Sequence, residues 1–353
     1  MTTGNHLADV AALFDGSRLA LGRKLAGLRK NALAGAIELT PAAISFYESG
    51  TKRPSAATVA KLALVLGVEP AFFLPDGVPD STASAHFRSL RSTTQLARDQ
   101  AEAYVRVVAE VHRALERHVD FPPVHVPALP VPPDCADDSP ERAAAALRAA
   151  WAVPTGPVAH TIRLAENNGV LVVFTPPQSA SVDAYSVARP DRPLILLNPA
   201  KDDYYRQRFD VAHELGHLVM HGDEEPGNNI IENQANRFAA EFLMPAEQIS
   251  PRLPARADWA LLAKLKETWG VSLQALLYRS RQLGIMRDVT YRNAMATIST
   301  RGWRRREPGE VVAVEQPSML PRAVGLVSPQ ALAEQSRLPA HLLSVITSRT
   351  PVD

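Results

Sequence analysis

The sequence predicts an α+β protein that is mostly helical and is divided into two or three domains. Its 353 residues exceed the roughly 100–200 residues of a single domain. Apolar residues make up 46% of the chain, which is enough to build cores. Helical spacing runs through most of the sequence, while short apolar runs at 170–174, 194–197 and 311–314 indicate strands. We therefore expect an all-α N-terminal domain, a long connecting helix, an α/β domain and a small C-terminal α/β region.

Changes in composition along the chain set the expected boundaries. The expected parts are a helical domain at 10–78, a connecting helix with a proline-rich linker at 82–137, an α/β domain at 138–286 and a C-terminal region without an assigned role at 287–353. The net charge of +1 excludes a uniformly basic nucleic-acid coat protein. It hides a basic first segment, an acidic centre and an arginine-rich stretch. The counts of Lys/Arg against Asp/Glu are eight to five in 1–75, four to ten in 200–250 and six to one in 287–306.

Cysteine usage and hydropathy predict the compartment. The single cysteine, Cys135, excludes an internal disulfide and a four-cysteine zinc site, and it favours a reducing environment. Residues 1–14 lack the basic flank and apolar centre of a signal peptide. Apolar runs such as 62–66 are far shorter than the roughly 20 residues of a membrane helix. We expect a cytoplasmic protein with no membrane partner.

Segment 17–74 is predicted to form short helices separated by turns. Thr40-Pro41 places a capping hydroxyl before a proline at the first helical position, and Gly50 ends that helix. Ser55 begins another helix, whose apolar residues recur at helical spacing until Gly67.

One long helix is predicted at 92–119. Its apolar positions are spaced by four and three residues: Ala97, Ala101, Tyr104, Val108, Val111 and Leu115. This is coiled-coil spacing, although the two alanines make a weak seam. The pattern fits a homodimer formed through 92–119 and packing on its own chain equally well.

The remaining elements follow the proline-rich linker 121–133, which is expected to be extended. They are a helix from Ser139-Pro140 to Trp151, a helix ending at the turn Asn168-Gly169, the strands 170–174 and 194–197, a helix ending near Gly222 and a helix at 231–244. In the C-terminal region we expect the strand 311–314 and two small helices that begin at Ser328-Pro329 and Pro339.

The residues His213-Glu214-Leu215-Gly216-His217 carry the strongest chemical signal. Two histidines at i and i+4 lie about one turn apart on one helix face, so both rings can bind one tetrahedral ion. Glu214 flanks the same site. Zinc lowers the pKa of a water molecule toward about 7, and a carboxylate can take its proton and pass it to the leaving amine. Gly216 is expected to keep the backbone open to a substrate. The arrangement is that of zinc peptidases.

The following helix offers the third ligand and outer partners. Glu232 is the expected ligand because the small Ala235 beside it lets the two helices approach closely. Asn236, four residues on, is expected to orient a ligating histidine from outside the metal shell. Glu241 lies half a turn out of phase with Glu232.

Two further positions are less well determined by the sequence. The loop residues Glu224 and Glu225 are less rigidly placed alternatives to Glu232. His221, one more i+4 step along the first helix, fits both a cap of the helix end and an outer partner of the metal site.

These residues also carry a family resemblance. The motif from Asn198 through Arg208-Phe209, the histidine helix and Glu232-x-x-Ala235-Asn236 to Met244-Pro245 resembles the ImmA/IrrE metallopeptidases over roughly 140–286. The resemblance implies a zincin-like α/β domain. It implies that His213, His217 and Glu232 bind zinc and that Glu214 is the general base. It also implies cleavage of a helix-turn-helix repressor or antitoxin.

Segment 17–74 is similar to XRE-type, phage-repressor-like DNA-binding domains, through Ile44-Ser45-Phe46-Tyr47-Glu48-Ser49-Gly50 and the following helix. The residues expected to face double-stranded DNA are Lys30, Thr40, Ala42, Ser45, Lys52 and Arg53. Two departures weaken base reading. Arg29-Lys30 replaces the family's usual Thr-Gln, and the proposed reading helix has no Arg, Asn or Gln for a bidentate base contact. Either the domain binds DNA with low sequence specificity, mainly through phosphate contacts, or it binds protein.

Three functions remain open on the sequence. The favoured one is a zinc endopeptidase of a stress, phage or toxin–antitoxin response that carries its own DNA-binding module, with manganese as an alternative metal. The second is a transcription regulator whose peptidase-like domain senses a signal without turnover. The third is self-cleavage, at the helix-turn-helix or near 121–137. No P-loop or dinucleotide fingerprint occurs, which argues against nucleotide chemistry.

Overall fold

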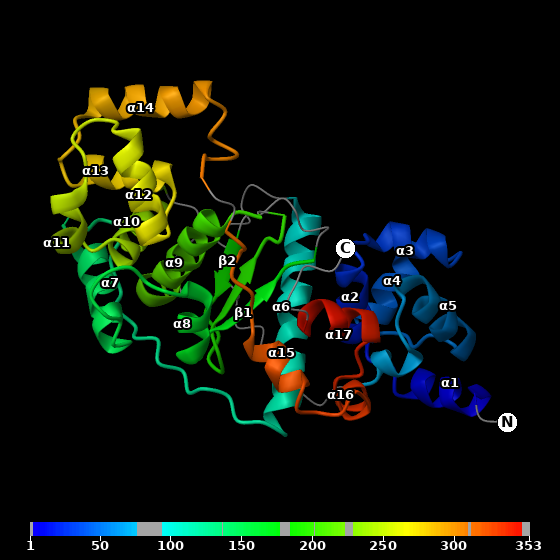
Figure 1. Cartoon of the computed structure of the whole chain (residues 1–353). Coiled ribbons are helices and arrows are strands. Elements are labelled where there is room, and N and C mark those ends of the chain that lie inside the picture. Colours follow the sequence, from blue (N-terminus) through cyan, green and yellow to red (C-terminus); the bar gives the residue numbers. More distant parts are fainter. Residues whose placement is uncertain are drawn as a thin grey trace. The chain divides into compact units, whose positions relative to one another are not determined.

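The computed structural model describes residues 3–75, 94–135, 137–176, 184–200, 202–222, 229–309 and 312–347. The chain forms two compact units (Figure 1): 1–121, 175–181 and 319–353 make up the first, and 122–174 and 182–318 the second. Helices dominate both units, and the described strands lie in the second, so the predicted mostly helical α+β class is confirmed. The domain boundaries given above stay predictions. Among the helices described, none is both long and apolar enough to cross a membrane.

The regular secondary structure described in the first unit is entirely helical. Its elements are α1 (Thr3–Ala12), α2 (Gly16–Leu25), α3 (Lys30–Ala36), α4 (Pro41–Glu48), α5 (Ala56–Leu66), a 3-10 turn η1 (Pro70–Phe73), α6 (Gln95–Glu116), α15 (Met319–Val324), α16 (Pro329–Ser336) and α17 (Ala340–Thr347). The predicted caps are confirmed. The Thr40 hydroxyl accepts from the Ala43 N–H at 3.3 Å, the Ser55 hydroxyl accepts from the Thr58 N–H at 3.2 Å, and Gly67 ends α5 in the left-handed conformation.

The long helix α6 packs within its own unit, against α2, α15 and α16. Its predicted seam positions Tyr104, Val108 and Leu115 are buried. Near them, the buried Arg18 of α2 pairs with Glu110 of α6 at 2.8 Å. Of the two alternatives for this helix, the structure favours packing on its own chain, because the same chain buries these seam positions.

The second unit places helices around a small sheet. Its elements are α7 (Ser139–Ala150), α8 (Thr161–Asn167), β1 (Leu171–Phe174), β2 (Ala184–Val187), β3 (Leu194–Leu197), α9 (Tyr204–Met220), α10 (Asn229–Leu243), α11 (Ala246–Ile249), the 3-10 turn η4 (Ser250–Arg252), α12 (Trp259–Trp269), α13 (Leu273–Gln282) and α14 (Asp288–Thr300). The strand order is β1-β3-β2, with β1 and β3 parallel and β2 and β3 antiparallel. Every residue of β1 and β3 is buried, as expected for strands with continuous apolar runs. Strand β2 was not predicted.

The proline-rich linker has no regular secondary structure, as expected, but it is packed against the second unit. The Leu129 N–H donates to the Val219 carbonyl at 2.8 Å and the Val131 N–H donates to the Met220 carbonyl at 3.2 Å. Gly169, with φ of +84°, leaves room for it, because a Cβ there would lie 2.5 Å from the Pro123 carbonyl oxygen. The linker is therefore hydrogen-bonded to the C-terminal end of α9.

The C-terminal region differs from the prediction. Residues 312–318 have no regular secondary structure, and residue 311 lies outside the described residues, so the expected strand is wrong for the part described. The physical reason is that Glu315 exchanges its backbone hydrogen bonds with the Gln207 side chain, at 2.8 and 2.9 Å, instead of with a strand. The helices expected near Ser328 and Pro339 are present as α16 and α17, so the regular secondary structure described in this region is helical.

Candidate metal centre

The helix α9 carries both histidines of the motif on one face. It begins where the Asp203 carboxylate accepts from the N–H groups of Tyr205 and Arg206, each at 3.0 Å. Helix α10 packs along α9, and β2 and β3 contact it as well. The rings of His213 and His217 are 4.7 Å apart between centroids, as their i, i+4 spacing predicts.

Three side chains from α9 and α10 converge on one point. The Nε2 atoms of His213 and His217 are 3.0 Å apart. The Glu232 carboxylate approaches His213 Nε2 at 3.2 Å and His217 Nε2 at 3.7 Å. All three ligand atoms lie within 4.8 Å of one another. Two imidazoles and a carboxylate are donors that a divalent cation requires, and an ion among them would offset the crowding of electron-rich atoms. These residues therefore fit a metal.

Outer hydrogen bonds hold both rings. His213 Nδ1 lies 3.1 Å from Asn236 Oδ1 on α10. His217 Nδ1 lies 2.9 Å from His221 Nδ1, and His221 Nε2 lies 3.0 Å from Gln234 Oε1. The structure thus places Asn236 and His221 beside the ligand set, and His221 is also the residue that ends α9. Gln234 was not predicted, because its amide reaches the site only through His221.

The ionisation of the cluster follows from its charges. Burial lowers the pKa of His213, but hydrogen bonding to Glu232 and the charges of Glu214 and Glu232 outweigh it, so the pKa is raised overall. The hydrogen bonds from His213 and His217 hold the pKa of Glu232 well below its usual range. The carboxylate is therefore ionised at neutral pH, as a metal ligand must be.

Glu214 is held by a residue that the sequence did not reveal. Its carboxylate accepts a hydrogen bond from the Ser186 hydroxyl on β2 at 2.6 Å, and the Glu214 side chain is buried. The signal that could have found Ser186 is the short run Ala184–Val187, in which three of four residues are apolar. Without this strand, no sequence feature connects Ser186 to the motif.

Gly216 has a different role from the one predicted. A Cβ at this position would lie 3.0–3.2 Å from the side chain of Phe238, so the space beside it is filled by α10 rather than open to a substrate. Phe238 and Ala235 are fully buried. Gly216 and Ala235 therefore let α9 and α10 approach closely, which brings Glu232 to the histidines.

The alternative carboxylates are not part of the described cluster. Glu241 pairs with Arg279 and accepts from the Ala246 N–H at 3.1 Å. It points away from Glu232, as the half-turn offset predicts. Glu224 and Glu225 lie outside the described residues.

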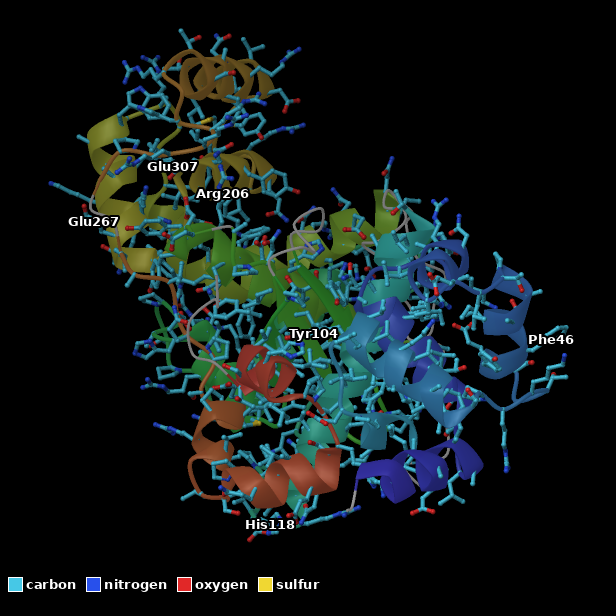
Figure 2. The ribbon with its side chains drawn as sticks, turned by 90° about the vertical axis from the view of Figure 1, so that its right-hand side faces the viewer. Phe46, Tyr104, His118, Arg206, Glu267 and Glu307 are labelled. Atoms are coloured by element: carbon cyan, nitrogen blue, oxygen red, sulfur yellow. The ribbon has the colours of Figure 1, made fainter. Side chains whose placement is uncertain are left out.

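Two cavities flank α10. One, of about 480 Å³, is lined by residues of α9, α10, α13 and α14, among them Arg206, Phe209, Asn236 and Tyr278. Arg206 is labelled in Figure 2. Because Asn236 also contacts His213, this cavity adjoins the metal centre.

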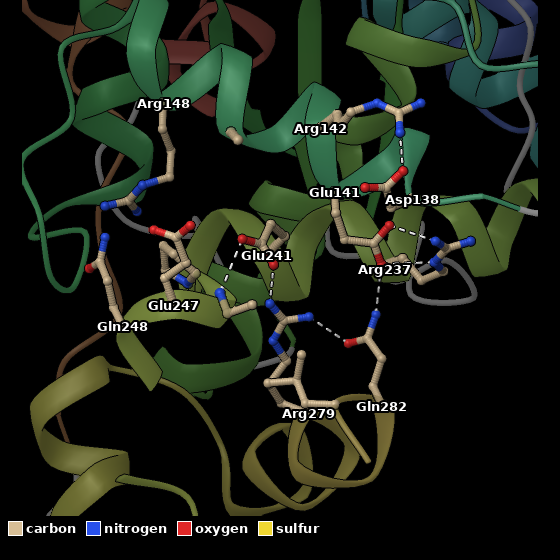
Figure 3. A pocket seen from close by; sticks show the side chains of 14 residues that line it. Asp138, Glu141, Arg142, Arg148, Arg237, Glu241, Glu247, Gln248, Arg279 and Gln282 are labelled. Atoms are coloured by element: carbon tan, nitrogen blue, oxygen red, sulfur yellow. Dashed lines mark hydrogen bonds and ion pairs between the residues drawn. The ribbon is translucent and has the colours of Figure 1, made fainter. Parts of the chain in front are cut away.

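The other cavity, of about 660 Å³, lies among α7, α10 and α13 (Figure 3). Its guanidinium groups already have partners: Arg142 with Asp138, Arg237 with Glu141, Arg279 with Glu241, and Arg148 with the Phe242 carbonyl. These contacts crosslink the helices, and the lining has as many carboxylates, Asp138, Glu141, Glu241 and Glu247, as arginines.

The expected DNA-facing residues lie on α3 and α4 and in the turn that follows. Thr40, Ala42, Lys52 and Arg53 are exposed. Phe46 is 41% exposed and projects from the first unit (Figure 2), and the Lys52 ammonium lies 5.1 Å from its ring centroid.

Two of the expected contacts are already engaged within the domain. The Lys30 ammonium donates to the Ser45 hydroxyl at 3.2 Å and pairs with Glu48 at 3.1 Å. Lys52 and Arg53 are thus the cations of this set that are best placed to meet phosphates.

Comparisons with known proteins agree with the two predicted resemblances. Residues 19–73 match the family model described as helix-turn-helix, and residues 165–281 match the one described as IrrE N-terminal-like domain. The chain therefore carries one segment similar to helix-turn-helix domains and one similar to the IrrE N-terminal-like domain, and both predicted resemblances are confirmed.

A curated relative is the radiation response metalloprotease IrrE of Deinococcus radiodurans. It is 35% identical over 105 residues, which are 25% of this chain. The match spans 31% of that relative's own length.

Proposed function

We propose that the chain is a zinc-dependent endopeptidase that cleaves a repressor or antitoxin-like protein and carries its own DNA-binding module. The observation that carries the proposal is the convergence of His213, His217 and Glu232 within 4.8 Å, with Glu214 on the same helix. A regulator that only senses a signal has no need of Glu214 beside three metal ligands.

The residues have distinct proposed roles. His213, His217 and Glu232 would hold the metal, which when bound supplies Lewis-acid polarisation of the peptide carbonyl and activation of water. Glu214 takes a proton from the attacking water and gives it to the leaving amine. The Ser186 hydroxyl keeps one carboxylate oxygen of Glu214 fixed. Two histidines and a carboxylate also suit manganese, so the native metal is a question for analysis of the purified protein.

Cleavage of a candidate substrate tests this proposal. The purified full chain is incubated with candidate helix-turn-helix repressors or antitoxins, in the presence of zinc, manganese or a chelator. We expect metal-dependent cutting by the wild type, and none by Glu214→Gln with its metal content unchanged. Cutting that continues in the chelator would contradict the proposal. Normal promoter regulation by Glu214→Gln would favour the sensor alternative.

The same experiment separates the remaining alternatives. A shorter product from the chain alone would indicate self-cleavage. The backbone hydrogen bonds of Leu129 and Val131 disfavour the linker as its own substrate, because a scissile segment must leave them. A homodimer through 92–119 would similarly require α6 to leave α2 and α16.

A further inference from the structure

A buried chain of hydrogen bonds leads from the metal centre to the proline-rich linker. It runs from His217 Nδ1 to His221 Nδ1 at 2.9 Å, from His221 Nε2 to Gln234 Oε1 at 3.0 Å, and from Gln234 Nε2 to the Pro132 carbonyl oxygen at 2.9 Å. His221 and Gln234 are each 1% exposed. Because water has little access to these two side chains, their hydrogen bonds to one another replace those that water would make.

The carbonyl at the end of this chain determines the direction of every hydrogen bond in it. A carbonyl oxygen only accepts, so the Gln234 amide must turn its NH₂ group toward Pro132 and its oxygen toward His221. That oxygen also only accepts, so His221 must carry its proton on Nε2. In the neutral ring of His221, Nδ1 then carries no proton and is an acceptor.

The last step reaches the metal ligand. Since His221 Nδ1 accepts, His217 Nδ1 must be the donor. The neutral ring of His217 then has its lone pair on Nε2, the atom that faces His213 and Glu232. We propose that Gln234 is a positioning residue which, through His221 and anchored on Pro132, holds His217 in the tautomer that binds the metal. The proposal rests on the proposed metal centre for its function, while the tautomer itself can be measured without metal.

The contact at His213 shows why the linker anchor matters. His213 Nδ1 lies against the Asn236 amide, which can turn either its oxygen or its NH₂ group toward the ring. In the hydrogen-bond chain that leads to His217, the Pro132 carbonyl fixes the orientation of the Gln234 amide. The linker therefore contributes to the metal centre although none of its residues touches the ligand atoms.

Histidine NMR on the metal-free full chain tests the tautomer directly. Imidazole nitrogen spectra, recorded at alkaline pH where the rings are neutral, are expected to show His217 protonated at Nδ1 and His221 protonated at Nε2. In Gln234→Leu, the signals of His217 are expected to shift toward a mixture of both tautomers. A wild-type His217 protonated at Nε2 would overturn the proposal, whatever the fate of the variant.

Zinc affinity provides the second readout, measured by competition with a chromophoric chelator. We expect Gln234→Leu to bind zinc roughly 10–100-fold more weakly than the wild type. Asn233→Leu makes nearly the same change at the exposed neighbour on α10 and is expected to keep wild-type affinity. Equal zinc affinity of Gln234→Leu and wild type would contradict the positioning role. If the wild type binds no divalent metal, the proposed function fails and the tautomer measurement alone decides this inference.

Discussion

At the scale of single residues, the metal centre depends on pairs of side chains from different elements. Glu232 of α10 meets the two histidines of α9, and Ser186 of β2 meets Glu214. The first pair was predictable, because helical phase singles out Glu232 over Glu241. The second was not, because nothing in the sequence links a serine to a carboxylate that lies 28 residues away.

The Ser186 hydroxyl leads to a prediction about catalysis. Replacing it in Ser186→Ala removes a hydrogen bond to a buried carboxylate, worth about 1.5–3 kcal/mol. We expect kcat for cleavage to fall roughly 10–100-fold, with zinc content unchanged, because Glu214 loses its fixed orientation. Ser186→Thr keeps the hydroxyl and serves as the control. Equal kcat values for Ser186→Ala and wild type would show that the contact has no catalytic role.

At the scale of elements, close packing of α9 on α10 brings the ligands together. Gly216 faces the buried ring of Phe238, which stacks on Phe242 with 6.0 Å between centroids and so has little freedom to move. A side chain at position 216 must therefore separate the helices or strain the core.

Matched glycine replacements test this packing. Alanine in a helix interior gains up to about 1 kcal/mol over glycine, but Gly216→Ala also overpacks the core at a cost of about 1–3 kcal/mol. We expect a lower melting temperature and weaker zinc binding. Gly35→Ala, on α3, gains the same helix propensity and meets nothing within 4 Å, so it is expected to be neutral or stabilising. A Gly216→Ala protein as stable as the wild type would mean that the Phe238 ring can move aside, and would contradict the argument.

Residues 307–309 and 312–318 connect several elements of the second unit. The Glu307 carboxylate, labelled in Figure 2, accepts from the Leu273 N–H at 2.8 Å and pairs with the buried Lys266 at 3.0 Å. The Glu315 carboxylate accepts from the Thr161 and Ile162 N–H groups, at 2.9 and 2.8 Å, and so caps α8. These residues are therefore integral to the second unit, although the sequence offered no role for them.

Replacing Glu315 is expected to destabilise the second unit. It pairs with Arg208 at 2.8 Å, and both side chains are more than nine-tenths buried. Glu315→Gln leaves the guanidinium of Arg208 without its counter-ion, and we expect a loss of about 3 kcal/mol in the free energy of unfolding. Denaturant titration measures this loss. Glu267→Gln, at an exposed position in the same unit, is the control and should change stability little; a similar effect of both variants would refute the argument.

At the scale of the whole molecule, the chain joins a helix-turn-helix unit to an IrrE-like unit. The near-equal totals of 38 Lys/Arg and 37 Asp/Glu hide this division. Because α3 and α4 have few side chains that read bases, we expect phosphate contacts to dominate binding to DNA.

Salt dependence of DNA binding tests this expectation. Lys52→Ala and Arg53→Ala in the full chain should weaken binding to duplexes of different sequence by similar factors. Each should reduce the slope of log affinity against log salt by about 1. Fluorescence anisotropy with labelled duplexes measures both effects. A loss confined to one duplex sequence would instead indicate base reading by these residues.

The sequence by itself determined the features that depend on local spacing. These are the helix class, the caps at Thr40 and Ser55, the two buried strands and the pairing of His213 with His217. Such features follow from hydrogen bonds and side-chain directions within a few residues, so they are readable from the sequence.

Only the tertiary structure decided what depends on contacts between distant segments. It showed that α6 packs on its own chain, that Gly216 serves the α9–α10 contact and that residues 312–318 join no strand. It also placed Ser186 beside Glu214 and Pro132 at the end of the chain from His217. The physical reason is that burial and hydrogen-bond partners far apart in sequence are set by how the elements pack, which no local pattern encodes.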